Sequence, residues 1–366
     1  MDDTNLTFDN LLAASRRFSR DDFVINLGGL VEDVGEMLAS DVAQGALVEA
    51  RKYIESVANE NLGGLLTDEM KQLSTWKFGD QSQAPELVAG QVAAIDGTPV
   101  LPMQKYSAGQ ALCVGIGSRS YVRTLDDVLH GYTSKAIIQG LERGKSEDIR
   151  RFLRRVQDGL YNISQTAYMR YFEAQHALDM PEPFIFCDGT LVYEWLVNQS
   201  IGRRVYKDLL AKKQAIGVMK STKENITFSW LGRALKPGEA FIHETLYEHV
   251  TALDAERAGR GIEPQWAQDG EFVKLSKKII RGVFKPAQKH FGFECHVDHL
   301  PVMFRLMAAD CQMNLPGHEI PFLLNQVDKE IRRFFKADMV QMRIQQTLSR
   351  DGEDLFFEEM EERDFR

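Results

Sequence analysis

Two short apolar segments separated by a single helical stretch constrain the fold of this chain most strongly. The first, Phe184-Ile-Phe-Cys-Asp188, follows Pro181 and Pro183 and is almost wholly apolar, as in strands that are buried on both faces. A helical stretch over 193–212 leads to the second segment, 215–219. The order strand, helix, strand predicts a parallel pair with a right-handed crossover, and therefore an α/β fold.

Apolar residues spaced three and four apart predict long helices elsewhere. The longest spans 146–178, with Ser146 as its N-cap, and stops at the two prolines. Residues 1 to about 75 show the same spacing in two runs, and a last helix is expected over 321–348.

Further strands are predicted on both sides of this region. Residues 91–102 predict a buried strand that ends or bends at Asp96-Gly97, and 111–117 return beside it as a hairpin. Three later apolar runs, 278–284, 293–300 and 302–308, are interpreted as a strand meander.

Composition places the chain among soluble globular proteins. It has 366 residues, of which 44% are hydrophobic and 27% charged. No signal peptide and no apolar run of about 18 residues is found, so we expect a cytoplasmic protein with no membrane partner. We expect an N-terminal helical extension (1–80), one elaborated domain (81–349) and an acidic tail (350–366).

Charge is distributed unevenly along the chain. The net charge is −9, and eight acids fall between Asp351 and Asp364, so the body is nearly neutral. Basic residues gather in four stretches, 143–155, 203–223, 274–289 and 329–336. These stretches form a nucleic-acid surface if folding brings them together, and are otherwise solvated helix faces.

The same tripeptide, Asp-Gly-Thr, follows two of the predicted strands. It occurs at Asp96-Gly97-Thr98 and at Asp188-Gly189-Thr190. An acid at the end of a buried strand lies at the rim of the sheet, where two such rims can place two carboxylates in one cleft. Each Asp-Gly can also be a simple turn, since this is a common turn dipeptide.

Two neighbouring carboxylates require a cation, because their mutual repulsion raises a pKa unless positive charge intervenes. Aspartates with few histidines favour a hard ion, Mn²⁺ or Mg²⁺, held by oxygen ligands. Such ions catalyse phosphoryl chemistry by activating water and neutralising the leaving oxygen.

An ordered series of motifs resembles that of the NurA nucleases, over residues from about 90 to 335. The motifs are Ala94-Ile-Asp-Gly-Thr98, Arg170-Tyr-Phe-Glu173, Ile185-Phe-Cys-Asp-Gly-Thr-Leu191, Ile216-Gly-Val-Met-Lys-Ser221 and Ile320-Pro-Phe-Leu-Leu-Asn-Gln-Val-Asp328. The resemblance implies a ribonuclease H-like mixed sheet flanked by helices, and Mn²⁺-dependent (or Mg²⁺-dependent) 5′-to-3′ exonuclease and single-strand endonuclease activity on DNA. It also implies a homodimer that works with a HerA-type hexameric ATPase in DNA end resection during double-strand-break repair.

The resemblance also implies roles for individual residues. Asp96 and Asp188 match the two metal-binding aspartates of the family. The family's glutamate on the preceding helix corresponds best to Glu173, which lies at the edge of the apolar stripe; the alternative is a solvated acid paired with Arg170. Glu182 is a rival, although its Pro-Glu-Pro setting restricts its aim.

Two further residues complete the expected site. Asp328 stands where relatives often carry histidine, and is either a metal ligand or a solvated helix acid. Lys220 follows an apolar strand, where its ammonium can contact a phosphate; the alternative is an ordinary exposed lysine.

Three functions fit these observations. The first is a metal-dependent DNA nuclease. The second is a catalytically inert adaptor of the same fold that docks on a motor ATPase or a DNA end. The third is a hydrolase of other phosphoesters, which small phosphate esters would reveal.

Overall fold

The computed structural model describes residues 40–57, 64–66, 84–106, 109–133, 165–222, 225–257, 265–313 and 320–335, with 342 and 346. The chain forms two compact units, Met1–Tyr53 and Ile54–Arg366. Helix α3 (Asp41–Val57) crosses the boundary between them and confirms the second of the two N-terminal helical runs. Among the described helices, none has the length and apolar character that crossing a bilayer requires.

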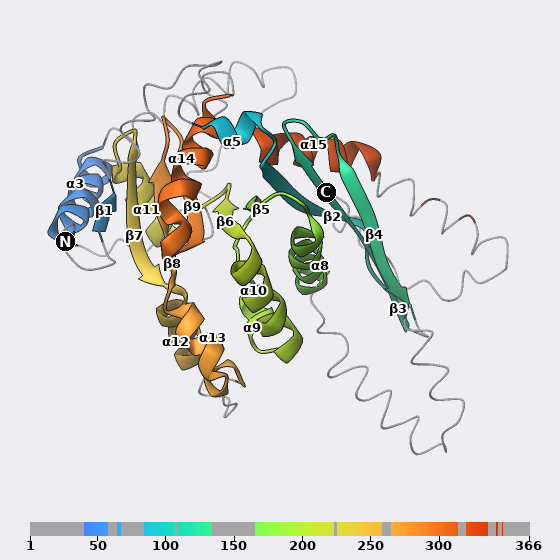
Figure 1. Cartoon of the computed structure of the whole chain (residues 1–366). Helices are drawn as coiled ribbons and strands as arrows, with labels where there is room; N and C mark the ends of the chain where they lie inside the picture. Colours follow the sequence, from blue (N-terminus) through green and yellow to red (C-terminus); the bar gives the residue numbers. More distant parts are fainter. Residues whose placement is uncertain are drawn as a thin grey trace, which may run out of the picture. The chain divides into compact units, whose positions relative to one another are not determined.

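In the part of the chain that the structure describes, nine strands form one mixed sheet in the order β1-β7-β8-β9-β6-β5-β2-β3-β4 (Figure 1). The strands are β1 (Gly64–Leu66), β2 (Val92–Tyr106), β3 (Gly109–Ser120), β4 (Asp126–Thr133), β5 (Phe184–Asp188), β6 (Gln214–Met219), β7 (Glu239–Thr245), β8 (Ile279–Lys285) and β9 (Phe291–His296).

Half of this sheet has the expected ribonuclease H-like arrangement. Strands β2, β3 and β4 form an antiparallel meander, β5 pairs parallel with β2, and β6 pairs parallel with β5. The helices α8 (Gln165–Asp179) and α10 (Ser200–Lys212) lie before β5 and before β6 along the chain. The parallel pair β5–β6 and the hairpin β2–β3 were both predicted from the apolar runs.

The other half of the sheet is antiparallel and was partly missed. Strand β9 pairs with β6, β8 with β9, β7 with β8, and β1 with β7. Strands β8 and β9 confirm two segments of the predicted meander, whereas β7 was not predicted. Because β1 lies within residues 1–80, the N-terminal extension is not helical throughout.

One predicted strand is wrong. Residues 302–308 belong to helix α14 (Leu300–Cys311), which has Pro301 in its first turn. Nearly every side chain of this helix is buried, and a short run that is apolar all round cannot be distinguished from a buried strand by periodicity.

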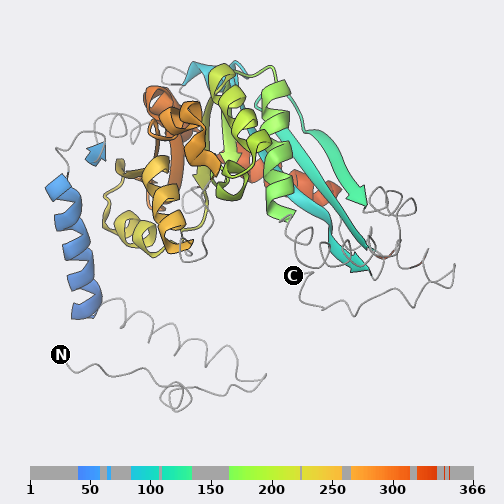
Figure 2. The same cartoon turned by 90° about the horizontal axis from the view of Figure 1, so that it is seen from below.

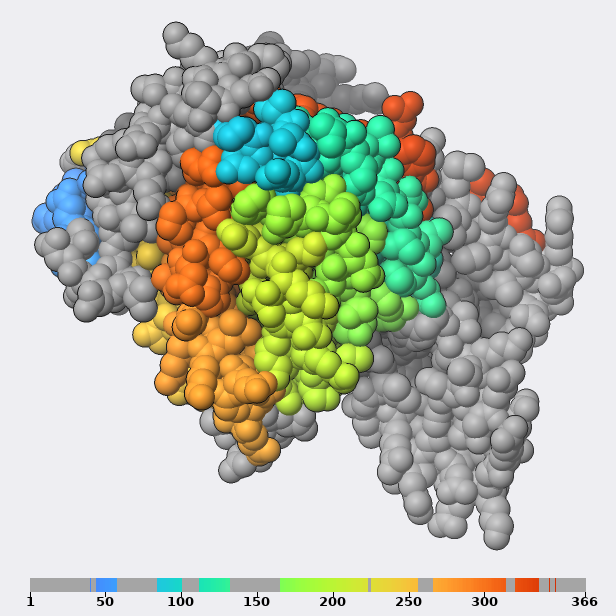
Figure 3. Space-filling model, in the orientation of Figure 1, coloured from blue at the N-terminus to red at the C-terminus, as the bar shows by residue number. Residues whose placement is uncertain are grey.

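Helices cover both faces of the sheet. Alternate residues point to opposite faces, so Ala93 and Ile95 pack with α8 and α10, whereas Val92 and Ala94 pack with α14 and α15 (Phe322–Phe334). Figure 1 shows α15 above the strands and α8, α9 (Glu194–Val197) and α10 below, and Figure 2, seen from below, shows α15 behind the strands. In the space-filling view, the α9–α10 segment fills the centre of the visible face (Figure 3).

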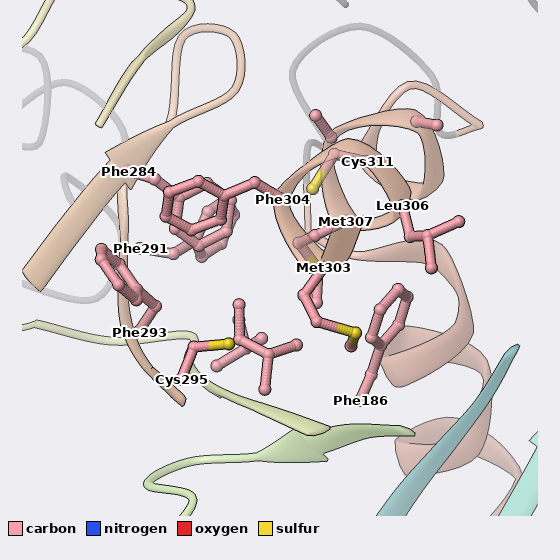
Figure 4. Packing of buried hydrophobic residues seen from close by; sticks show 14 of the residues in the cluster. Phe186, Phe284, Phe291, Phe293, Cys295, Met303, Phe304, Leu306, Met307 and Cys311 are labelled. Carbon is pink, nitrogen blue, oxygen red and sulfur yellow. The ribbon is translucent and has the colours of Figure 1, made fainter. Parts of the chain in front are cut away.

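The core between the sheet and α14 is aromatic and rich in sulfur (Figure 4). Phe284 and Phe293 of the sheet contact Phe304 of α14, with ring centroids 5.7 and 4.8 Å apart. Met303 and Met307 fill the space around them, as flexible thioethers do in irregular cores. This packing fixes α14 against β8 and β9.

The remaining described helices are α5 (Pro85–Val88), α11 (Ile226–Ala234), α12 (Leu246–Arg257) and α13 (Gly270–Ser276). The helix predicted over 193–212 is interrupted between α9 and α10. The expected start of α8 at Ser146, the end of the last helix at 348 and the acidic tail lie outside the described residues.

Candidate functional site

Asp96 lies where two neighbouring strands separate. The parallel pairing of β2 with β5 ends at Ile95 and Cys187, but the pairing of β2 with β3 continues through Asp96 and Gly117. The expectation that the strand ends at Asp96 is therefore wrong; its pairing with β3 becomes irregular only further on, with register shifts after Pro99 and after Leu101. Asp96 still lies at the edge of the parallel pair, because it is the first residue of β2 beyond the pairing with β5.

Asp188 is the last residue of β5 and is followed by a true turn. Gly189 has a φ of 81°, a left-handed conformation that glycine adopts without strain, and its N–H donates to the Val218 carbonyl at 2.8 Å. The chain then crosses β6 at Gly217, where an added Cβ would lie 2.2 Å from the Leu191 nitrogen. Two glycines thus let this turn pack on the sheet.

Lys220, just beyond β6, joins the two aspartates. Its Nζ lies 2.9 Å from Asp188 Oδ2 and 3.8 Å from Asp96 Oδ2. The side chains of Asp96 and Asp188 are 6% and 20% exposed, so neither faces open solvent. Segments 92 positions apart in sequence therefore bring two carboxylates to one shared cation.

Glu173 approaches from α8, on the other face of the sheet, through the space left by Gly97. An added Cβ on Gly97 would lie 2.6 Å from Glu173 Oε1, so this glycine makes room for the carboxylate. Its Oε2 accepts a hydrogen bond from Arg170 Nη1 at 2.7 Å. Its Oε1 is buried and has no hydrogen-bond partner of good geometry in the described structure. The ion pair with Arg170 that was expected on a solvated face is thus buried in the site.

Asp328 lies on α15, which packs against β2, β3 and β5. Its carboxylate is 26% exposed and accepts a hydrogen bond from Arg332 at 2.8 Å. It also repels Asp96 and attracts Lys220 electrostatically. Asp328 therefore lies at the margin of the cluster.

Burial and repulsion shape the charge states of these groups. Burial raises the pKa of Asp96 well above its usual range, Asp188 adds to the rise, and Lys220 opposes it. Burial likewise raises the pKa of Glu173, although Arg170 works against it. Burial acts to lower the pKa of Lys220, but Asp188 and Asp96 outweigh it and the pKa is raised. The cluster has an excess of negative charge that further positive charge would relieve.

The oxygen donors of this cluster have the chemistry that a hard divalent ion prefers. Asp96, Asp188 and Glu173 offer carboxylate oxygens, and the buried Glu173 Oε1 has the Gly97 N–H nearby but no hydrogen bond of good geometry. With the side chains placed as here, however, no three His, Cys, Asp or Glu residues within the described ranges converge on one point. Lys220 stands between the two aspartates instead.

Glu182, the rival to Glu173, is engaged elsewhere. Arg123 binds both of its carboxylate oxygens, at 2.9 and 3.1 Å. A fork-to-fork pair of this kind fixes the carboxylate on Arg123.

Sequence reasoning missed several residues that hold the site. Arg170 donates from Nη1 to the Asp188 carbonyl as well as to Glu173. Glu294 Oε2 accepts from the buried Val192 N–H at 3.1 Å, and its Oε1 accepts from Arg281 at 2.7 Å. These contacts anchor the turn after Asp188. Arg170 lies within the motif Arg170-Tyr-Phe-Glu173. Its contacts with Glu173 and the Asp188 backbone depend on burial in the folded protein, which the sequence does not reveal.

Part of the basic charge serves internal pairing. Arg203 is buried and donates to the Val197 carbonyl and to Asp269, and Lys207 pairs with Asp269 and Glu271. The stretch over 203–223 is therefore not a uniform phosphate-binding surface. The stretch over 143–155 lies outside the described residues.

Comparisons with known proteins match no protein-family model and no curated protein to this chain. Solved structures are matched. The NurA nuclease from Sulfolobus solfataricus is 10% identical over 71% of this chain and 84% of its own, with a TM-score of 0.35. NurA bound to dAMP and manganese (10% identity, 72% and 90% coverage, TM-score 0.38) and NurA with manganese (10%, 72% and 92%, 0.35) are also similar.

These structures come from the family that the sequence motifs resemble. With superpositions this loose, the fold assignment rests on the strand order given above, and the site rests on its own side chains.

Proposed function

We propose that this protein is a divalent-metal-dependent DNA nuclease in which Asp96 and Asp188 hold the ion. The observation that carries the proposal is that these acids, from two distant segments, meet at one cation position beside the buried Glu173. Buried carboxylates are costly to gather unless a cation is part of the design.

The chain's own residues take distinct parts in this reaction. Asp96 and Asp188 bind the ion, Glu173 supplies its unpartnered Oε1, and Asp328 adds charge at the margin. A bound Mn²⁺ or Mg²⁺ would activate water and neutralise the leaving oxygen of a phosphodiester. Lys220 contacts the phosphate, and Arg170 holds Glu173 and the Asp188 backbone in place.

The finer features of the proposal come from the resemblance in sequence motifs. They are 5′-to-3′ exonuclease and single-strand endonuclease activity, a homodimer, and work with a HerA-type ATPase in DNA end resection. Light scattering tests the dimer, and co-purification with such an ATPase tests the partnership.

A nuclease assay tests the central claim. DNA labelled at the 5′ or 3′ end is incubated with Mn²⁺, Mg²⁺ or EDTA, and wild type is compared with Asp96→Asn and Asp188→Asn. We expect cleavage with a divalent ion, none in EDTA and none in either variant. Glu182→Gln is the matched control, because its carboxylate is bound to Arg123. Activity retained in Asp96→Asn or Asp188→Asn would contradict the site.

A second candidate is a catalytically inert adaptor of the same fold. The observation that favours it is that Lys220, rather than a third acidic donor, neutralises the two aspartates in the described structure. DNA binding without cleavage in any divalent ion would select this alternative. Turnover of small phosphate esters without preference for polynucleotide would select a different hydrolase.

A further inference from the structure

The charges of the cluster divide into three sets. Glu173 is paired with Arg170, and Asp328 is paired with Arg332. Asp96 and Asp188 are left to share the ammonium of Lys220, at 3.8 and 2.9 Å. If these groups are ionised, the pair of aspartates with Lys220 keeps one unneutralised negative charge.

The ammonium occupies the place from which a cation would reach both aspartates. Its Nζ contacts Asp188 Oδ2 at 2.9 Å and forms a longer ion pair with Asp96 Oδ2 at 3.8 Å, and these aspartates are the donors that the proposed function gives to the metal. An ammonium placed between the two carboxylates fills the space that a divalent ion would need in order to bridge the same two oxygens. Binding of one therefore excludes the other from this position.

Lys220 is suited to leave. Lysine carries a compact charge on a flexible four-carbon stem, so the ammonium can move without backbone change. The residue lies beyond the end of β6, where Ser221 is already exposed. Its side chain is 21% exposed, so it has a path to solvent.

We propose that Lys220 is a built-in competitor for the metal: its ammonium fills the cation position between Asp96 and Asp188, and a divalent ion binds by displacing it. This inference rests on the proposed function, because it takes the aspartates as the metal donors. It unites two roles for one side chain. Lys220 neutralises the aspartates until the ion binds, and the released ammonium is then available to a DNA phosphate.

Metal affinity without turnover tests the competition. Mn²⁺ binding is measured by calorimetry at one fixed pH for wild type, Lys220→Met and Lys212→Met, the last being a control at an exposed lysine at the end of α10. We expect Lys220→Met to bind Mn²⁺ about tenfold more tightly than wild type, because the competing ion pair is gone. Its melting temperature in EDTA should fall, and Mn²⁺ should raise it by more than in wild type.

A second measurement uses only the wild-type protein, so its result does not depend on whether a variant folds. Amine-reactive labelling of the intact protein, read by mass spectrometry, reports how accessible each lysine is. Without divalent ions Lys220 should label slowly; with saturating Mg²⁺ its rate should rise several-fold, while that of Lys212 stays constant. Unchanged labelling of Lys220 under saturating Mg²⁺ would overturn the displacement.

The outcomes separate this inference from the proposed function. If wild type binds Mn²⁺ and Asp96→Asn abolishes binding, but Lys220→Met binds no more tightly, the site stands and the competitor fails. If Mn²⁺ binding is absent, or is the same in Asp96→Asn and Asp188→Asn as in wild type, both fail.

Discussion

The two Asp-Gly-Thr segments are identical in sequence but different in structure. The first lies inside β2, where Gly97 pairs with Ile116 of β3 and the strand continues. The second ends β5, and Gly189 turns the chain with a φ of 81°. Asp96 is nearly inaccessible, whereas Asp188 is 20% exposed and closest to Lys220.

The difference shows that one tripeptide serves two physical purposes. Gly97 is needed for space, since Glu173 and Met169 fill the volume that a side chain would take. Gly189 is needed for its backbone conformation as well as for the Arg170 guanidinium packed beside it. What the segments share is the aspartate, and both aspartates reach the same lysine.

The largest expected effect is on cleavage activity, and it tests the aspartate that the two segments share. Asp96→Asn and Asp188→Asn should each lower the rate of Mn²⁺-dependent DNA cleavage on the order of a thousandfold or more, because each removes a charge that holds the ion. Their stabilities in EDTA should differ: Asp96→Asn should unfold at a higher temperature than wild type, since it removes a buried, repelled carboxylate. Equal melting temperatures in the two variants would break the contrast.

The next effect concerns Asp310 of α14, which links Tyr121, just after β3, to the start of α15. Asp310 is fully buried, and its carboxylate accepts hydrogen bonds from Tyr121 at 2.6 Å and from the Leu323 N–H at the start of α15. Burial raises the pKa of Asp310 to about 7 from an ordinary value of 3.8. Between these values the folded protein keeps a proton that the unfolded chain releases, so this group's contribution to stability is greatest below pH 4 and falls as pH rises towards 7.

Asp310→Asn should remove this dependence. Denaturant unfolding from pH 4 to 7.5 should show wild type losing on the order of a few kcal/mol relative to the variant over that range. Parallel curves for the two proteins would show that Asp310 does not titrate in this way.

A smaller effect on Mn²⁺ affinity distinguishes Glu173 from Glu182, the two candidates that the sequence offered for the glutamate ligand. Glu173→Gln should weaken Mn²⁺ binding by about 10-fold to 100-fold, the range typical of groups that support a metal site. Glu182→Gln should change it less than about twofold, because that carboxylate is bound by Arg123 and lies outside the cluster. Calorimetry decides, and the reverse order would exchange the two assignments.

The smallest effect separates the purposes of the two glycines. Gly97→Ala and Gly189→Ala should each cost about 1 kcal/mol or more in the free energy of unfolding. An added Cβ at Gly189 meets only the end of the flexible Arg170 side chain, so backbone conformation sets the ranking there. Asparagine tolerates the left-handed conformation, so Gly189→Asn should cost less than Gly189→Ala. Gly97→Asn should cost more than Gly97→Ala, because there the difficulty is volume. The same ranking at both positions would mean that the two glycines serve one purpose.

Sequence patterns predicted the parts of the fold that depend on local chemistry. The apolar runs of β5 and β6, with the helical stretch between them, predicted the parallel pair. The acids at the ends of apolar runs pointed to the two aspartates. Residues 302–308 were misassigned because α14 is buried all round, which removes the periodicity that distinguishes a helix. Strand β7 was missed, and its burial comes from residues distant in sequence: Ala240 and Ile242 belong to the core cluster around Phe304, and Phe241 packs with Phe228 and Leu231 of α11.

The sequence by itself singled out the candidate residues of the proposed site: Asp96 and Asp188 after apolar runs, Glu173 on its helix and Lys220 beyond β6. Tertiary structure decided which of them meet and how. Arg123, which is far from Glu182 in sequence, binds that carboxylate. The space left by Gly97 accommodates the Glu173 carboxylate, which comes from the opposite face of the sheet. Local patterns set burial and backbone conformation, whereas ion pairing between distant segments depends on distances that exist only once the sheet has formed.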